Sequence, residues 1–284
     1  PYNTDYWNTL ASAQFLQGNM AATIESCDYA LAIDTTNADA LINKANALSS
    51  LGNCEEAIKC YQSFHRLQPY NETADMCIAS VLTTQNRFQE ALFHLRQAER
   101  LAPKDSPSKI EIIRQQCILN AQLGKHAEAL ADIRKMDGIP GHNTAENNVL
   151  RGYLYLLNNQ PVNANAWFTR AMEISGNDIR IKTLVAYSTY ECGYTQFAHD
   201  LFREIMDNNL GKDSPEGWAF LALCDVDLGL RQEFLSDLHQ AVLQGPAKSR
   251  PLLVDIFPEG LPFENYEKYA KEHPELGTWP NKKR

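Results

Sequence analysis

Apolar residues recur along most of the chain with the three-to-four-residue spacing of amphipathic helices. The helical stretches come in pairs, and a single Gly or Asn separates the two members of each pair. These break residues recur every 34 to 38 residues and are Gly18, Gly52, Asn86, Gly124, Asn159, Gly193 and Gly229. A helix often ends with one residue in the left-handed region, where Gly costs nothing sterically and Asn costs little. The pattern therefore predicts seven pairs of antiparallel helices joined by tight turns.

Two further positions of the pattern carry small residues. Seven residues before the breaks stand Ala11, Ala45, Ala79, Cys117, Gly152, Ala186 and Ala222. Five residues after the breaks stand Thr23, Ala57, Ala91, Ala129, Ala164, Ala198 and Phe234. Small residues let paired helices approach closely, so Phe234 predicts looser packing in the last pair. Nine residues after the breaks, from Cys27 to Leu238, an apolar residue is expected to fill the space between pairs.

The first pair reads W-x-x-L-A from Trp7, and the second reads G-N-C-E-E-A-I from Gly52 and ends at Pro69. Trp218, Leu221, Ala222, Gly229, Ala241 and Pro246 repeat this order near the far end. The chain thus resembles the tetratricopeptide repeat family over residues 4–247. The resemblance implies an all-α, right-handed superhelical solenoid of about seven helix-turn-helix repeats. We place these repeats at about 4–37, 38–71, 72–105, 110–143, 145–178, 179–212 and 215–247.

Residues 248–284 depart from the repeat. Residues 263–273 carry a helical apolar stripe, and a solenoid end exposes an apolar face that an atypical helix commonly covers. We therefore expect a capping helix followed by an exposed end. The alternative is that this helix docks into a partner.

In proteins of this family the first helix of each repeat lines a concave groove, at positions 13, 10, 6 and 3 before the break. When these groove positions are carried over by alignment, those of repeats five and six hold aromatic side chains. Such side chains are good anchors for a partner peptide or helix. The residues predicted to contact a partner are Tyr153, Tyr187, Tyr190, Val149, Leu156, Arg180, Thr183, Arg114 and Asn46. The alternative is that neighbouring helices or the tail bury the tyrosines.

Some members of the family bind chaperone C-termini through a carboxylate clamp of Lys, Asn and Arg on three successive first helices. Such donors would hold a terminal carboxylate through charge-assisted hydrogen bonds. In the first frame the five clamp positions hold Asn8, Ser12, Asn43, Thr73 and Cys77, and only Asn43 matches. A frame starting in repeat four has Arg114 and Arg180, but Ile118, Leu150 and Leu184 stand at the other positions. We predict no binding of chaperone tails by this mode.

No motif for catalysis is present in the sequence. There is no C-x-x-C or H-E-x-x-H for zinc, and Gly211-Lys212-Asp213-Ser214 lacks the earlier glycine and the Ser after Lys of a phosphate loop. The seven histidines are scattered, and a structural role is favoured over metal binding. We expect no enzymatic activity, no metal and no cofactor.

Composition limits the classes of partner and the compartment that we expect. The net charge is −9 and the basic residues are scattered, which disfavours nucleic acid, and no stretch is long and apolar enough for a membrane span. The seven cysteines are an odd number within helical patterns, which favours a reducing, cytoplasmic setting. Because the chain begins at Pro1 without Met, a removed signal peptide or an upstream domain is compatible with it.

The function expected from the sequence is a non-catalytic scaffold that holds a peptide or helix of a partner protein in its groove. Two alternatives stay open: a self-associating assembly module that forms a homo-oligomer, or the helical arm of a larger protein.

Overall fold

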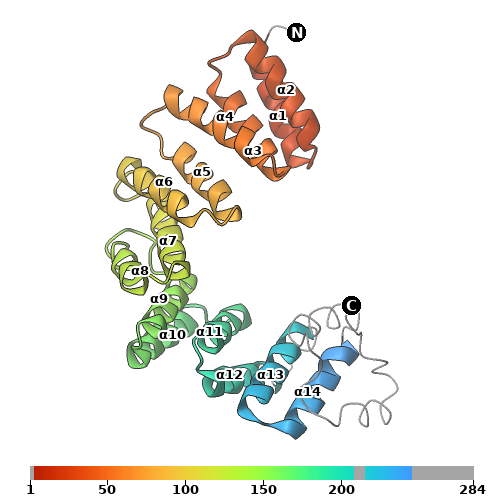
Figure 1. Cartoon of the computed structure of the whole chain (residues 1–284), viewed down its shortest axis with the longest axis vertical. Helices are drawn as coiled ribbons and strands as arrows, with labels where there is room; N and C mark the ends of the chain where they lie inside the picture. Colours follow the sequence, from red (N-terminus) through yellow and green to blue (C-terminus); the bar gives the residue numbers. More distant parts are fainter. Residues whose placement is uncertain (1–2, 208–214, 245–284) are drawn as a thin grey trace. The chain divides into compact units, whose positions relative to one another are not determined.

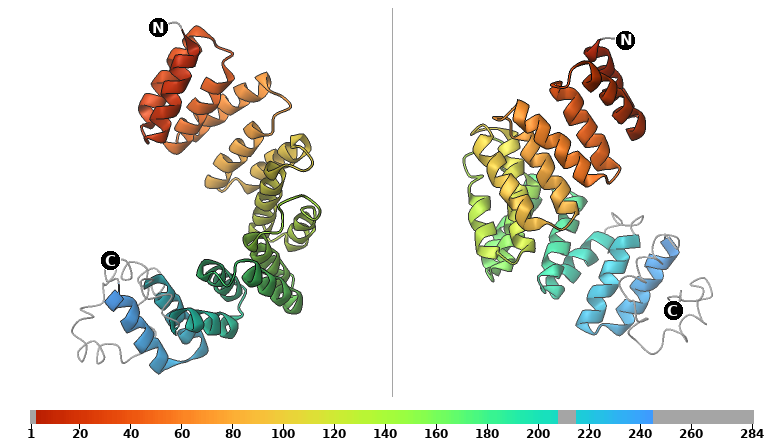
Figure 2. Two further views of the ribbon diagram at one scale, coloured as in Figure 1. Left: turned by 180° about the vertical axis from the view of Figure 1, so that it is seen from behind. Right: turned by 45° about the horizontal axis from the view of Figure 1, so that its top comes forward.

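The computed structural model describes residues 3–207 and 215–244, and this part of the chain is helical without strands. The helices follow one another as hairpins (Figures 1 and 2). The chain divides into two compact units, residues 1–142 and residues 143–284. The all-α repeat fold predicted from the sequence is confirmed.

Unit 1 holds four helix pairs. Their members are α1 (Thr4–Leu16), α2 (Met20–Ile33), α3 (Ala38–Ser50), α4 (Cys54–Leu67), α5 (Thr73–Thr84), α6 (Phe88–Leu101), α7 (Pro107–Gln122) and α8 (His126–Arg134). Each odd-numbered helix packs most closely on the even-numbered helix that follows it. The largest core cluster of the unit runs from Ala45 to Leu119, so neighbouring pairs share one continuous apolar interior.

Unit 2 holds three helix pairs among its described residues. Their members are α9 (Ala145–Leu157), α10 (Pro161–Ile174), α11 (Ile179–Glu191), α12 (Thr195–Asp207), α13 (Pro215–Leu228) and α14 (Arg231–Gln244). Its core cluster extends from Ala145 to Cys224 and includes Phe168 and Phe202. Repeated hairpins thus bury a continuous core in this unit as well.

The turn inside each pair has the backbone that the sequence predicts. All seven break residues have positive φ, from 56° at Asn159 and 58° at Asn86 to 81° at Gly193. After Gly52 the amide of Asn53 donates to the carbonyl of Leu48 at 2.9 Å, and Arg87 donates to Leu82 in the same way. This contact satisfies a carbonyl at the helix end, as in a Schellman motif.

The small positions lie inside the helix pairs, also as predicted. The alanines seven residues before and five residues after the breaks are all fully buried. Gly152 shows how tight this contact is, because a Cβ atom there would lie 2.3 Å from Cε1 of Phe168. In the fifth pair, the absence of a side chain at residue 152 makes room for the ring of Phe168.

The expectation of looser packing around Phe234 is wrong. The Phe234 side chain is fully buried, and α13 and α14 are among the most closely associated helix pairs. The ring is therefore part of the core of the last pair. The capping helix expected at 263–273, the tail 248–284 and residues 211–214 lie outside the described residues.

Candidate functional site

The first helices of unit 2 carry most of the predicted contact residues. Tyr187 on α11 packs edge-on against Phe202 of α12 and Phe220 of α13, with ring centroids 5.3 and 4.5 Å apart. Three residues later, the hydroxyl of Tyr190 donates to Asp227 Oδ2 on α13 at 2.7 Å. These contacts place the two tyrosines of α11 against α13.

Each of the three tyrosines is half-buried and faces its own carboxylate. Burial, then the charge of Glu191, raises the pKa of Tyr153 to about 12. Burial and the charge of Glu216 raise the pKa of Tyr187 above its ordinary value. Burial and the hydrogen bond to Asp227 do the same for the pKa of Tyr190. We call Tyr153, Tyr187 and Tyr190 the tyrosine row; its hydroxyls stay protonated at neutral pH.

Two predicted contact residues lie in the core instead. Val149 and Leu156 of α9 are each 5% exposed and belong to the main cluster of unit 2. Leu156 also lines a cavity of about 310 Å³ together with Phe168 and Thr189. The following helices cover these two side chains, so they support α9 and do not offer a surface to a partner.

Arg180 and Thr183 on α11 have local partners. Arg180 is the most exposed of the predicted set and pairs with Asp178 at 2.7 Å, just before the helix. The Thr183 hydroxyl donates to the backbone carbonyl of Ile179 at 2.8 Å. The charge of Arg180 is therefore already paired. The hydroxyl of Thr183 is occupied by a hydrogen bond within its own helix.

Asn46 and Arg114 belong to unit 1. The side chain of Asn46 accepts a hydrogen bond from the hydroxyl of Tyr61 at 2.7 Å. Arg114 forms an ion pair with Glu111 one turn earlier on α7. Both side chains thus have partners within unit 1, and the predicted set is divided between the two units.

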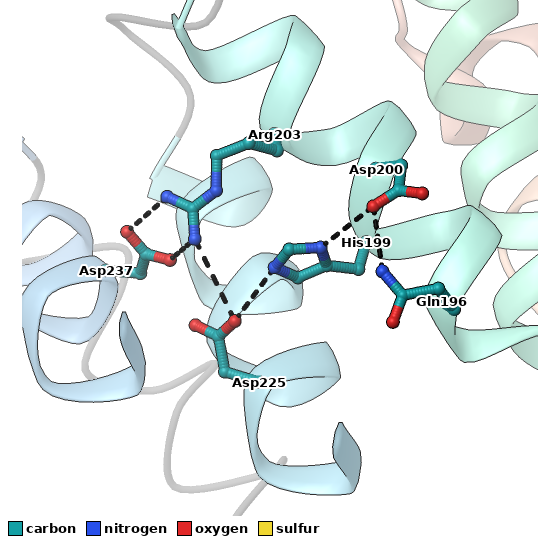
Figure 3. A network of polar contacts seen from close by, with 6 residues as sticks. All are labelled: Gln196, His199, Asp200, Arg203, Asp225 and Asp237. Carbon is teal, nitrogen blue, oxygen red and sulfur yellow. Dashed lines mark hydrogen bonds and ion pairs between the residues drawn. The ribbon is translucent and has the colours of Figure 1, made fainter. Parts of the chain in front are cut away.

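A buried polar network in unit 2 was not predicted from the sequence (Figure 3). Arg203 of α12 donates to both oxygens of Asp237 on α14, at 3.1 and 2.7 Å. His199 Nε2 lies 3.1 Å from Oδ1 of Asp225 on α13, whose side chain is fully buried. Burial, then the hydrogen bond and charge of Asp237, raises the pKa of Asp225 to about 8.

This network joins α12 to both helices of the last pair. Two buried carboxyl groups face one guanidinium, so a proton retained on Asp225 reduces the repulsion between them. One feature of the sequence could have indicated this buried network: Asp237 stands directly before Leu238, which is a predicted core residue.

The described residues contain no group of three or more His, Cys, Asp and Glu side chains placed to hold a metal ion. Among the helices of this part of the chain, none combines the length and the apolar character that a bilayer crossing requires.

Comparison with solved structures supports the fold. A tetratricopeptide repeat protein from Parabacteroides merdae ATCC 43184 is 14% identical, with a TM-score of 0.68 over 90% of this chain and 97% of that one. The pilF protein of Pseudomonas aeruginosa is 18% identical, with a TM-score of 0.57 over 73% and 92%. YrrB, described as having an unusual peptide-binding site, is 19% identical, with a TM-score of 0.51 over 66% and 93%.

The fold and the repeat define the class of this chain: an α-helical repeat protein built from helix pairs. Within that class, residues 42–106 match the family model described as tetratricopeptide repeat. The resemblance to the tetratricopeptide repeat family is thereby confirmed. No curated protein sequence matched the chain.

Proposed function

We propose that this chain is a non-catalytic scaffold that holds a peptide or helix of a partner protein against the tyrosine row. The observation that carries the proposal is the arrangement on the first helices of unit 2, where three half-buried tyrosines lie beside carboxylates. Tyrosines that are already packed or hydrogen-bonded lose little side-chain entropy when a partner binds. The peptide-binding site named for the structural neighbour YrrB is in keeping with this proposal.

The charges beside the tyrosine row indicate which kind of partner segment would fit there. Glu191, Glu216 and Asp227 are exposed and accompany the three tyrosines, whereas the one exposed arginine in the predicted set is paired with Asp178. A Lys or Arg of the partner would gain both a carboxylate and an aromatic face. We therefore propose a partner segment that alternates basic and apolar side chains, and we do not expect nucleic acid.

The test combines affinity capture from the native host with a double variant. Tyr153→Ala/Tyr190→Ala removes two members of the tyrosine row but leaves Tyr187, whose ring packs on Phe202 and Phe220. Tyr70→Ala is the matched control, because Tyr70 is 88% exposed and lies in unit 1. We expect the captured partner to bind the double variant at least about tenfold more weakly, and to bind the control as it binds the parent chain.

Unchanged affinity of the double variant for every captured protein would contradict the proposed surface. If the captured protein is a second copy of this chain, the scaffold binds itself, and light scattering will show a dimer that the double variant lacks. Circular dichroism of the double variant separates loss of binding from loss of helix.

None of the seven cysteines, all of which lie among the described residues, forms a disulfide bond. Thiols are kept in this form in a reducing compartment. We accordingly propose a cytoplasmic location. Fractionation of host cells that express the complete gene product tests it, and recovery in a secreted fraction would exclude it.

A further inference from the structure

Unit 1 contains a cavity of about 540 Å³ between α4, α5 and α6. Its volume lies within the range of small-molecule sites in proteins. Most of its lining residues lie on the second helices α4 and α6, and Asp75 and Ile78 come from the first helix α5. No residue singled out in the sequence as a contact residue belongs to it.

The walls of the cavity are mainly apolar. Ile78 of α5 is buried, and Leu101 ends α6 on the same cavity. Phe93 of α6 is 58% exposed and also lines it. An aromatic side chain that remains exposed beside buried apolar residues offers an apolar ligand a face to pack against.

Two arginines at this cavity have no carboxylate partner. Arg66 forms no hydrogen bond or ion pair with any described residue, and Arg100 has only a 3.4 Å contact with Gln97. Elsewhere in the chain, arginines such as Arg87 and Arg203 bind carboxylates at 2.7 Å. In a chain with net charge −9, carboxylates are abundant. Two guanidinium groups left without one at the same cavity favour an anionic ligand.

The cavity also holds one acid, Asp75, which lies close to two histidines. His94 Nδ1 lies 2.7 Å from Oδ1 of Asp75, and His65 Nδ1 lies 3.6 Å from Oδ2. The Asp75 side chain is 8% exposed, and its Oδ2 atom accepts no hydrogen bond from the described residues. Because a carboxylate only accepts, the Nδ1 atom of His94 carries the proton. The arginines are therefore the exposed charges of the cavity.

We propose that this cavity binds a monoanionic carboxylate attached to an apolar group. The carboxylate accepts charge-assisted hydrogen bonds from Arg66 and Arg100, and the apolar group packs against Phe93 and Ile78. A monoanion is favoured over a phosphate dianion because the two arginines share the cavity with the negative charge of Asp75. The carboxylate belongs either to a free small acid or to the last residue of a polypeptide.

Calorimetric titration of the full chain with 3-phenylpropionate tests the proposal. Its neutral amide and phenyl phosphate are the comparison ligands. We expect the acid to bind at least about tenfold more tightly than either, which corresponds to about 1.4 kcal/mol. A hexapeptide that ends in phenylalanine, prepared with a free or an amidated carboxyl group, distinguishes the two sources of the carboxylate. If the peptide with the free carboxyl group binds more tightly than the small acid, the natural ligand is a polypeptide terminus.

Arg66→Gln/Arg100→Gln removes both cations and should weaken binding of the acid at least tenfold. Arg134→Gln is the matched control, because Arg134 is an exposed arginine of the same unit that does not line the cavity. Equal binding of acid and amide, no loss in the double variant, or no binding below about 10 mM would overturn the proposal. Tighter binding of phenyl phosphate would overturn its choice of carboxylate. An unfolding temperature of the double variant equal to that of the parent chain verifies that the fold is intact.

Discussion

At the scale of single residues, two glycines of the repeat are required for opposite reasons. A side chain at Gly152 would collide with the ring of Phe168, although the backbone there is ordinary helix. At Gly52 nothing lies within 4 Å of an added Cβ, but φ is +79°. The first glycine is required by packing and the second by backbone conformation.

Gly152→Ala should lower the free energy of unfolding of unit 2 by about 1–3 kcal/mol, because the added methyl overpacks a filled core. Urea denaturation of the full chain, followed by circular dichroism, measures this loss. The double variant Gly152→Ala/Phe168→Leu is the informative comparison, because the smaller side chain at residue 168 makes room for the added methyl group. Strict additivity of the two substitutions would show that residues 152 and 168 do not compete for the same space.

The buried carboxyl of Asp225 predicts a pH dependence. Its pKa rises from 3.8 in the unfolded chain to about 8 in the folded one, so the folded state holds a proton that the unfolded state has lost. This contribution to stability is fully present below about pH 4 and is lost as the pH rises through about 8. We therefore expect the stability of unit 2 to fall between pH 6 and 8 because of this group.

Asp225→Asn removes the titrating group, so urea midpoints of this variant should change less over that pH range than those of the parent chain. Asp200→Asn is the matched control, because Asp200 contacts the same histidine but is 64% exposed. An identical pH profile for the parent chain and Asp225→Asn would contradict a retained proton on Asp225.

At the scale of the helix pair, the turn residue determines whether the second helix can fold back. Gly52→Ala and Asn86→Ala should each destabilise unit 1 by about 1–2 kcal/mol, the cost of a left-handed backbone for a residue with a Cβ and no polar side chain. Asn86→Gly should be neutral or slightly stabilising, because φ is already 58° there. Denaturant unfolding of the three variants measures these differences. A destabilising Asn86→Gly would mean that the Asn side chain itself contributes to the turn.

At the scale of the whole molecule, each unit has its own core cluster. In repeat proteins stability is approximately a sum over repeats and their nearest neighbours. We therefore expect fragments 1–142 and 143–284 to be helical and to unfold cooperatively when expressed separately. Far-ultraviolet circular dichroism with urea titration tests this, and a non-cooperative transition in either fragment would show that the fragment depends on the other unit. Gly152→Ala should affect only the second fragment.

Contact residues were predicted less completely than the fold. The groove positions carried over from the family placed Tyr153, Tyr187 and Tyr190 on first helices, where they are half-buried. The same rule also chose Val149 and Leu156, which neighbouring helices bury. A helix register identifies which residues share a face, but the packing of the next pair determines how much of that face remains exposed.

The sequence by itself determined the helix pairs, their turns and their small contact positions. These features depend on short-range rules: the helical period, the left-handed preference of Gly and Asn, and the size of one residue against its neighbour. Only the tertiary structure decided that Phe234 is buried, that Asp225 and Asp237 share Arg203, and that Arg66 and Arg100 line one cavity. Each of these depends on residues of different helices that meet only after the pairs have packed.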